Sequence, residues 1–501
     1  MNVQLGSTVS LWADTCTMPA RGALREDALA DVVVVGGGIA GLTTAYFLAR
    51  KGQRVIVLDS RPLGGETERT SAHLVTALDQ RYHALEGLHG KEHAQLAAES
   101  HATAIQTIED IIQQEAIDCD FARLDGWLYA PETESREEIE KELKACHRVG
   151  LAGVERHEAV PGLSLKMAGC LRFPQQARMH PLKYLRGLLL AVERQGVRVF
   201  TGTHVDKVEG GKTARVTTHA GHTVTAKAVV VATNTPVNDI LTLHTKQAAY
   251  RSYVVGMEVA RGAVPDLLLW DTLDPFHYVR IEPGDPVDVV VVGGEDHKTG
   301  QDEGITDRFE RLEAWARARF PVTVPRHRWS GQIMVSTDGL AFIGRNPGDH
   351  DNVFVVTGDS GNGLTHGTIA GLLLSDLITG ADNPWAKVYD PARMPGGKEF
   401  VKEAVNMAAQ YADWVRPGDV TRIEDIQRGQ GGVVRRGLSL VAVYCDADGR
   451  FTECSAVCPH LGAAVRWNRV EHTWDCPAHG SRFAPQGEAL HGPAISGLKR
   501  L

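Results

Sequence analysis

The apolar positions near the start of the chain predict a βαβ unit. Four consecutive valines, Val32–Val35, are typical of a strand buried on both faces. A glycine-rich turn follows over Gly36–Gly41, and helical spacing continues over Leu42–Lys51. Arg54–Leu58 is then a second apolar strand, which ends at Asp59.

Longer helical patterns and short strands fill the middle of the chain. Apolar residues at helical spacing predict helices over His93–Ile117 and Ser135–Val149, and we interpret these two helices as a helical insertion. A helix from His180 to Gln195 leads into a series of strands. Strands are expected over 197–200, 205–208, 214–218, 222–226, 228–232, 250–259, 278–282, 287–292 and 353–357, and helices over 306–319 and 368–378.

The pattern changes again towards the C-terminal end. An amphipathic helix is expected over Glu399–Val415, and Pro417 with Gly418 interrupts it. From Ile426 onward the apolar runs are short and separated by turns, which predicts a small β domain.

Composition limits the possible classes of protein. A chain of 501 residues is long enough for two or three domains, and its net charge of −9 gives no reason to expect nucleic acid or an anionic membrane. No apolar run approaches the roughly 20 residues that cross a bilayer, and we recognise no secretory signal. Four of the eight cysteines crowd the end of the chain, which does not resemble a disulfide framework. We therefore expect a cytoplasmic protein.

The glycine turn carries the first chemical signal. Gly36–Gly41 fits G-x-G-x-x-G, and its place between a strand and a helix lets backbone N–H groups face a pyrophosphate. Asp59 lies where a ribose hydroxyl needs an acceptor. These residues predict a dinucleotide site, whereas a purely structural βαβ turn is the alternative. No second such motif follows, so we expect no separate NAD(P)H domain.

Two Cys/His pairs near the end carry the second signal. Cys458 and His460 lie in the sequence CPHLG, and Cys476 and His479 lie in CPAHGS. Two cysteines and two histidines in this order match the ligands of a Rieske [2Fe–2S] cluster, in which the cysteines hold one iron and the histidines the other. A tetrahedral zinc site from the same four residues is the alternative.

Residues 10–385 resemble the D-amino-acid-oxidase-like (DAO) family of flavoproteins. The resemblance rests on the first glycine turn, the polar segment Gly64–Leu74, Trp12 and a second glycine turn, Gly358–Gly367. It implies that the dinucleotide is FAD. The residues that it implies for FAD binding are Gly36, Gly38, Ile39, Ala40, Gly41, Asp59, Ser60, Arg61, Thr70, Ser71, Ala72, Val205, Thr233, Gly361, Asn362, Gly363, Leu364 and Thr365.

The last 85 or so residues resemble the Rieske domain family. Gly492–Ala494 is similar to the proline loop that shields such clusters. High-potential members carry an extra cysteine in each ligand loop, but those places hold Ala463 and Ala478 here, so that disulfide cannot form. With Ser481 as a remaining hydrogen-bond donor, we expect a potential towards the low end of the range of about −150 to +300 mV.

The predicted fold class is α/β plus all-β. A Rossmann-like FAD-binding domain is interleaved with an α+β substrate domain and followed by a small β Rieske domain. The flavoprotein region is expected over residues 1–400, with FAD-binding segments at about 28–80, 165–245 and 335–385. Substrate and helical segments are expected at about 81–164 and 246–334, a linker helix over 401–416, and the Rieske domain over 417–501.

The two redox groups together suggest a function. The DAO resemblance implies an enzyme that oxidises a C–N bond of an amine or an amino-acid-like substrate, and the cluster would pass electrons singly to an external protein or quinone. Candidates to line the substrate pocket are Tyr253, Tyr278, Arg280 and Gln332. Of these, Arg280 could pair with a substrate carboxylate through two parallel hydrogen bonds.

Other interpretations stay open from the sequence. Electrons could run in reverse, from the cluster to FAD, or the protein could be a non-catalytic redox sensor or electron carrier. A Rieske oxygenase is disfavoured because no further domain remains to hold a mononuclear iron. His73 and His366 are candidate sites for a covalent bond to the flavin.

Overall fold

A six-stranded sheet forms the centre of the nucleotide-binding part. The computed structural model describes residues 6–238, 243–301, 307–394, 396, 398–410 and 418–501. The strand order is β18-β19-β12-β2-β3-β8, and all neighbours are parallel except β18. The strands are β2 (Val32–Val35), β3 (Val55–Leu58), β8 (Arg198–Phe200), β12 (Ala228–Val231), β18 (Phe342–Arg345) and β19 (Val353–Thr357).

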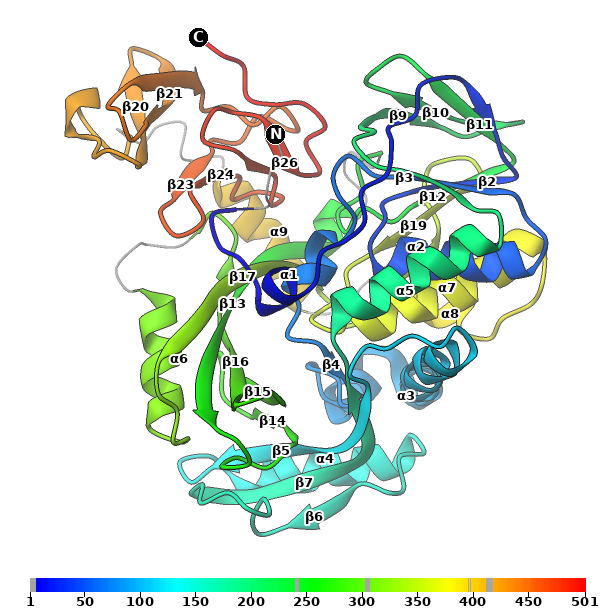
Figure 1. Ribbon diagram of the computed structural model, residues 1–501, viewed down its shortest axis with the longest axis vertical. Coiled ribbons are helices and arrows are strands. Elements are labelled where there is room, and N and C mark those ends of the chain that lie inside the picture. Colours follow the sequence, from blue (N-terminus) through cyan, green and yellow to red (C-terminus); the bar gives the residue numbers. More distant parts are fainter. Residues whose placement is uncertain (1–5, 239–242, 302–306, 395, 397, 411–417) are drawn as a thin grey trace.

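The run of valines is buried on both faces, as its pattern predicts. Val32 and Val34 pack into the core that contains the helices α2 (Ile39–Arg50), α5 (Pro181–Arg194) and α7 (Gly363–Thr379), which lie together on one side of the sheet (Figure 1). Val33 and Val35 enter a second core on the opposite face. That core is closed by a four-stranded sheet of β1 (Ala28–Leu29), β9 (Val205–Glu209), β10 (Ala214–Thr218) and β11 (Thr223–Ala226).

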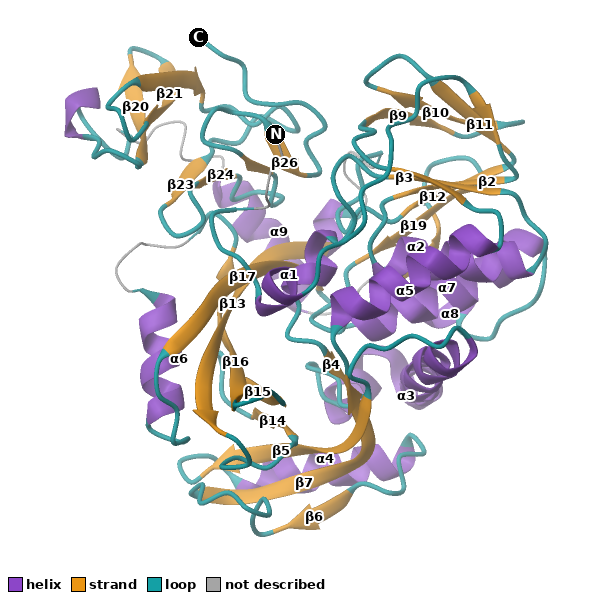
Figure 2. Cartoon of the chain, in the orientation of Figure 1, coloured by secondary structure: helices purple, strands orange, loops and turns teal. Residues whose placement is uncertain are grey.

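A nine-stranded sheet forms the substrate domain. It contains β4 (His73–Leu74), β5 (Ala122–Pro131), β6 (Glu155–His157), β7 (Met167–Arg178), β13 (Gln247–Ala260), β14 (Leu268–Asp271), β15 (Tyr278–Glu282), β16 (Val287–Lys298) and β17 (Pro325–Ser336). Figure 2 shows these strands curving below the nucleotide-binding part, with α6 (Arg308–Arg317) against them.

The segment of residues 81–164, in which the sequence predicts helices alone, contains both helices and strands. It contains α3 (Tyr82–Gln114), which is broken at Gly90, and α4 (Arg136–Arg148). It also supplies β5 and β6, while β7 lies in the substrate sheet although the sequence placed it in an FAD-binding segment. Apolar residues do not alternate along β5, which is buried only over its second half, so the strand carries no period-two signal.

The C-terminal domain consists of two small antiparallel sheets. One contains β20 (Gly431–Arg436), β21 (Ser439–Cys445) and β22 (Phe451–Ser455), and the other contains β23 (Arg466–Asn468), β24 (Thr473–Asp475), β25 (Arg482–Phe483) and β26 (Ala489–His491). Helix α9 (Lys398–Ala409) precedes them, and the end of the predicted linker helix, 411–417, lies outside the described residues. Short helices are α1 (Leu11–Thr15), α8 (Ala386–Tyr389), η1 (Gly65–Arg69), η2 (His244–Lys246) and η4 (Ile423–Asp425).

The predicted fold class is confirmed: a parallel nucleotide-binding sheet, an interleaved substrate sheet and a small β domain. In the part of the chain that the structure describes, no helix combines the length and apolar character needed to cross a membrane.

A buried ion network fixes the small domain to the rest of the protein. Glu471 of the small domain is fully buried and contacts Arg251 at 3.1 Å and Arg69 at 3.4 Å. Its carboxylate also accepts hydrogen bonds from Ser330 and Thr8. Burial alone would raise the pKa of Glu471, but the surrounding arginines outweigh it and lower the pKa to about 2.

We expect Glu471→Gln to destabilise the protein by about 3–5 kcal/mol, because the arginines would remain buried without their carboxylate. The folded pKa of Glu471 lies below its ordinary value of 4.5, so the stabilisation is present above pH 4.5 and is lost as the pH falls towards 2. Chemical unfolding at several pH values measures this. The control is Glu453→Gln in the surface pair with Arg436, where a loss of at most about 1 kcal/mol is expected.

Candidate functional site

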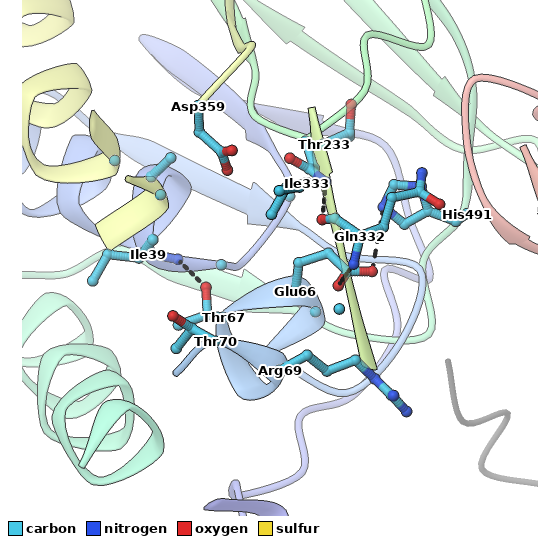
Figure 3. A pocket seen from close by; sticks show the side chains of 18 of the residues that line it. Ile39, Glu66, Thr67, Arg69, Thr70, Thr233, Gln332, Ile333, Asp359 and His491 are labelled. Atoms are coloured by element: carbon cyan, nitrogen blue, oxygen red, sulfur yellow. Dashed lines mark hydrogen bonds and ion pairs between the residues drawn. The ribbon is translucent and has the colours of Figure 1, made fainter. Parts of the chain in front are cut away.

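One cavity of about 430 Å³ collects residues from all three parts of the chain. Of the residues predicted to bind FAD, all except Gly41, Ala72 and Thr365 line it. Its other walls come from the substrate sheet and from residues 488–495 of the small domain. Figure 3 shows one end, where Ile39, Thr67 and Asp359 lie on one side and Gln332 and His491 on the other.

The first glycine turn has the geometry that a bound dinucleotide requires. Gly36 has φ +108°, and a Cβ there would lie 2.3 Å from the Ala232 carbonyl oxygen. A Cβ on Gly41 would lie 1.9 Å from the Gly36 oxygen, so Gly41 acts by letting helix and turn pack rather than by lining the cavity. The backbone can therefore approach a ligand closely.

Asp59 and Arg61 supply charge at this end of the cavity. Asp59 accepts hydrogen bonds from the backbone N–H groups of Gly37 at 2.7 Å and Arg61 at 2.9 Å. The Nη1 atom of Arg61 is buried with no hydrogen-bond partner among the described residues, and burial lowers the pKa of this guanidinium. An anionic group such as a pyrophosphate would satisfy it, so these residues fit FAD.

Sequence reasoning missed the contribution of η1. The Thr67 hydroxyl accepts a hydrogen bond from the Ile39 N–H at 3.1 Å and so caps α2 where Gly38 has no side chain (Figure 3). Trp12 donates to the Thr70 carbonyl at 2.7 Å, which holds the following segment in place. The polar segment itself was the signal, but its exact contacts depend on the fold.

In both histidines considered for a covalent bond to the flavin, each ring nitrogen already contacts a polar atom of the protein. His73 contacts the Ser71 hydroxyl at 3.0 Å and the Val279 carbonyl at 3.1 Å. His366 contacts the Asp359 carbonyl at 2.9 Å and His101 at 3.2 Å. Both line the cavity, and their protein hydrogen bonds fix the two rings.

The four candidate substrate residues separate into two pairs. Tyr278 and Gln332 line the cavity, and the Tyr278 hydroxyl lies 2.6 Å from the Ser252 hydroxyl. Tyr253 is instead buried in a hydrophobic core, where it stacks on His297 and contacts Phe309.

Arg280 does not point at the cavity either. Its guanidinium donates to the carbonyls of Ala72 at 3.0 Å and Met179 at 2.9 Å, and it pairs with Glu282. It also lies 4.9 Å from the Trp12 ring, as a cation–π contact. With these partners it is not placed to bind a substrate carboxylate.

The four predicted cluster ligands converge in the small domain. Both ligand loops end in a short turn, and Cys458 and Cys476 lie in the core with Trp474 and Phe483. The two thiols are hydrogen-bonded to each other, and this bond is the main cause that lowers the pKa of Cys458 to about 7. The hydroxyl of Ser481 adds a second hydrogen bond to Cys458.

The two histidine rings lie edge to face, with their centroids 5.0 Å apart. Burial lowers the pKa of both His460 and His479 to about 4, so the rings are neutral near pH 7, which is the form that binds metal. Neither ring nitrogen of His460 has a hydrogen-bond partner within the described residues. These orphaned nitrogens and the paired thiols fit a cluster in which each iron takes two protein ligands.

Residues outside the small domain cover the histidine side of this centre. His244 of η2 lies 5.0 Å from His460 and 5.4 Å from His479 between ring centroids, and the Met407 sulfur of α9 lies 3.0 Å from His479 Nε2. Among the described residues, no three His, Cys, Asp or Glu side chains surround a single ion position. No disulfide joins the eight cysteines.

A parallel nucleotide-binding sheet, a glycine-lined cavity and a paired Cys/His centre define a flavoprotein oxidoreductase with an iron–sulfur domain. The family model for FAD-dependent oxidoreductases (DAO) matches residues 31–377, and the model for the Rieske [2Fe–2S] domain matches residues 416–501. The chain belongs to the DAO family of FAD-dependent oxidoreductases and ends in a Rieske domain. It therefore binds FAD and a [2Fe–2S] cluster, and the zinc interpretation is set aside.

Individual relatives agree with this assignment. The chain is 30% identical over 98% of its length to the putative Rieske 2Fe-2S iron-sulfur protein YhfW of Bacillus subtilis, of which 97% is covered. It is 27% identical to the γ-glutamylputrescine oxidoreductase of Escherichia coli, over 77% of this chain and 93% of that protein. Glycine oxidase from Geobacillus kaustophilus shares the fold, with a TM-score of 0.62 at 18% identity over 74% of this chain and all of that one.

Proposed function

We propose that this protein oxidises a C–N bond of a cationic amine and passes the electrons singly through its Rieske cluster to an external one-electron acceptor, either a protein or a quinone. The observation that carries the proposal is the shared cavity: the glycine turn, the substrate sheet and the small domain all line it. When bound, FAD takes up an electron pair, whereas a [2Fe–2S] cluster carries one electron at a time. Each substrate oxidised would thus reduce two molecules of a one-electron acceptor.

The charges of the cavity favour an amine over an amino acid. Asp79, Asp296 and Asp359 all line it, and burial is the main cause that raises the pKa of each carboxyl, to about 6, about 7 and about 7. The lining residues from β13 to β16 and their connections are Ser252, Val254, Trp270, Phe276, Tyr278 and Asp296, and no Lys or Arg is among them in the described structure.

A bound ammonium group would stabilise these carboxylates in their charged form. A free substrate carboxylate would find no cationic partner on this wall. The name of the γ-glutamylputrescine oxidoreductase to which the chain is similar also supports an amine substrate. We therefore favour amines with a second positive charge or a neutral group in place of the α-carboxylate.

Anaerobic mixing with a panel of compounds tests the proposal. Putrescine, spermidine and N-acylated putrescines should bleach the flavin absorbance, whereas glycine, proline and alanine should not. The electron paramagnetic resonance (EPR) signal of a reduced cluster should follow the bleaching. Bleaching by amino acids alone would contradict the substrate class, and a cluster that stays oxidised would contradict the direction of electron flow.

We expect Asp296→Asn to lower kcat/KM by about 10- to 100-fold for an amine that reduces the flavin. The reason is that the substitution removes a charge-assisted contact worth about 1.5–3 kcal/mol. In the unchanged protein kcat/KM should rise with pH through 6–7, as the raised carboxyl pKa values are passed and the carboxylates become charged. The control is Glu258→Gln on β13, an acid that pairs with Arg326 outside the cavity. Equal losses of kcat/KM in both variants would show that Asp296 has no specific role in binding the amine.

A further inference from the structure

We propose that Gln332 positions the Rieske ligand loop against the flavin cavity and thereby sets the rate at which electrons cross from FAD to the cluster. The inference rests on the proposed function, in which electrons leave FAD through the cluster. It assigns Gln332, a candidate substrate residue in the sequence, to the junction of three parts of the chain.

On the cavity side, Gln332 belongs to β17 and is almost fully buried. Its backbone N–H donates to Glu66 Oε2 at 2.8 Å, and both residues line the cavity. In Figure 3 Gln332, Glu66 and His491 point towards one another at one wall. Glu66 lies in the segment that the family resemblance assigns to flavin contact, so this wall faces the cofactor end of the cavity.

On the cluster side, the Gln332 Nε2 atom donates to the Gly480 carbonyl at 3.0 Å. Gly480 directly follows His479, an iron ligand. It has φ +78°, and a Cβ there would lie 2.3 Å from the Ala249 methyl and 3.0 Å from Gln332 Nε2. The ligand loop is therefore seated tightly on β13 and β17.

The second N–H of the same amide group reaches another loop of the small domain. Gln332 Nε2 lies 3.2 Å from His491 Nδ1, and His491 Nε2 lies 3.7 Å from Glu66 Oε1. Burial is the main cause that lowers the pKa of His491 to about 4, so its ring is neutral. In the tautomer that carries its hydrogen on Nε2, towards Glu66, Nδ1 accepts from the amide; the same atom lies 3.3 Å from the Gly492 carbonyl oxygen. The remaining amide atom, Oε1, lies 3.5 Å from the Thr299 hydroxyl.

One side chain thus bonds to two loops of the small domain, the ligand loop at Gly480 and the cavity-lining loop at His491. Hydrogen bonds just outside a metal ligand orient that ligand and tune the centre, and their loss typically costs 10- to 100-fold in metal affinity or activity. In the proposed function the two electrons of each oxidised C–N bond would cross this junction one after the other, and the external acceptor would take the first electron from the cluster before the second crosses. Because the Gln332 amide fixes the ligand loop, it would affect the rate at which each of the two electrons is transferred from FAD to the cluster.

The test uses the full chain loaded with FAD and cluster. Gln332→Met keeps the length of the side chain and removes the amide. The flavin is reduced anaerobically by light with EDTA, samples are frozen at intervals, and the cluster signal is followed by EPR relative to flavin bleaching. We expect the crossing to slow by about 10- to 100-fold and the line shape of the reduced cluster to change.

Gln301→Met is the matched control. The Gln301 Nε2 atom donates to the Pro477 carbonyl of the same ligand loop at 3.0 Å, but Gln301 does not line the cavity. We expect this variant to slow the crossing less than Gln332→Met does, because Gln301 holds the ligand loop but makes no contact with the cavity-lining loop at His491 among the hydrogen bonds described above. Equal slowing in both variants would make Gln332 a simple loop anchor and overturn the proposal, as would an unchanged rate in Gln332→Met.

A second variant decides the matter if Gln332→Met fails to hold FAD or iron. His491→Phe removes the acceptor at Nδ1, so the Gln332 amide keeps its hydrogen bond to Gly480 and loses the one to the cavity-lining loop. Slower crossing is expected, and an unchanged rate would overturn the proposal. If the unchanged protein never reduces its cluster from reduced flavin, the proposed function fails. If the unchanged protein does reduce its cluster in this way and Gln332→Met does so at the same rate, the proposed function stands and the role of Gln332 is ruled out.

Discussion

His479→Ala should abolish the cluster and leave FAD in place. The variant removes one of the two proposed nitrogen ligands of one iron, and the neighbouring Ala478 offers no replacement. The residues predicted to hold the flavin belong to the nucleotide-binding part of the chain. Iron content should therefore fall towards zero while FAD content stays close to that of the unchanged protein. Metal analysis and absorbance spectra measure both.

The same variant separates flavin chemistry from electron exit. A substrate amine should still bleach the flavin in a single turnover, whereas steady-state reduction of a one-electron acceptor protein should fall by at least about 100-fold. The control is His472→Asn, which changes a histidine that stacks on Trp467 at 6.1 Å and is no ligand. Asn tolerates the positive φ of 52° at that position. Normal turnover in protein shown to lack the cluster would rule out the relay.

Gly36→Val should abolish FAD binding, and this is the second large effect. A valine at φ +108° is strained, and its Cβ would lie 2.3 Å from the Ala232 carbonyl oxygen, a backbone atom that cannot move without disturbing β12. We expect near-complete loss of FAD, measured by absorbance after purification, together with a lower unfolding midpoint.

Gly52→Ala is the matched control for backbone strain alone. Gly52 follows α2 with φ +77°, and no atom of the described residues lies within 4 Å of an added Cβ. It should cost about 1 kcal/mol and keep FAD. Gly38→Val should give a folded protein, because an added Cβ at Gly38 lies 3.3 Å from Thr67 Oγ1 and contacts no backbone closely in the described structure. It should still lose FAD, because the side chain would occupy space where the glycine turn lets the ligand approach the backbone. Full FAD occupancy in Gly36→Val would show that the dinucleotide lies elsewhere.

Local patterns predicted much of the fold. The four valines, the glycine turn and Asp59 lie in consecutive elements, so their order alone indicates a nucleotide-binding βαβ unit. The two Cys/His loops are equally local, because each pair lies within four residues. Helix α5 was predicted nearly to the residue, since His180 and Pro181 mark its start: the His180 side chain caps the Lys183 N–H.

Pairing between distant strands was not predictable in the same way. Strand β5 pairs with β7 and β14, which lie far from it in the sequence, and its burial follows those partners rather than its own pattern. Helices alone were predicted within the substrate and helical segment 81–164, and β5 and β6 were missed there for this reason. Strand propensity reflects packing against neighbours that only the tertiary structure supplies.

The sequence by itself determined the two redox groups, because their ligand motifs are short and each needs a fixed local geometry. Only the tertiary structure decided how the groups meet. Arg280 looked suited to a substrate carboxylate, yet the fold places its guanidinium against Ala72, Met179 and Glu282. His491, far from the glycine turn in sequence, forms a wall of the flavin cavity because Glu471 and its arginines hold the small domain there. Such contacts pair buried charges that lie far apart in the sequence, and a local sequence pattern does not show which charges will be buried together.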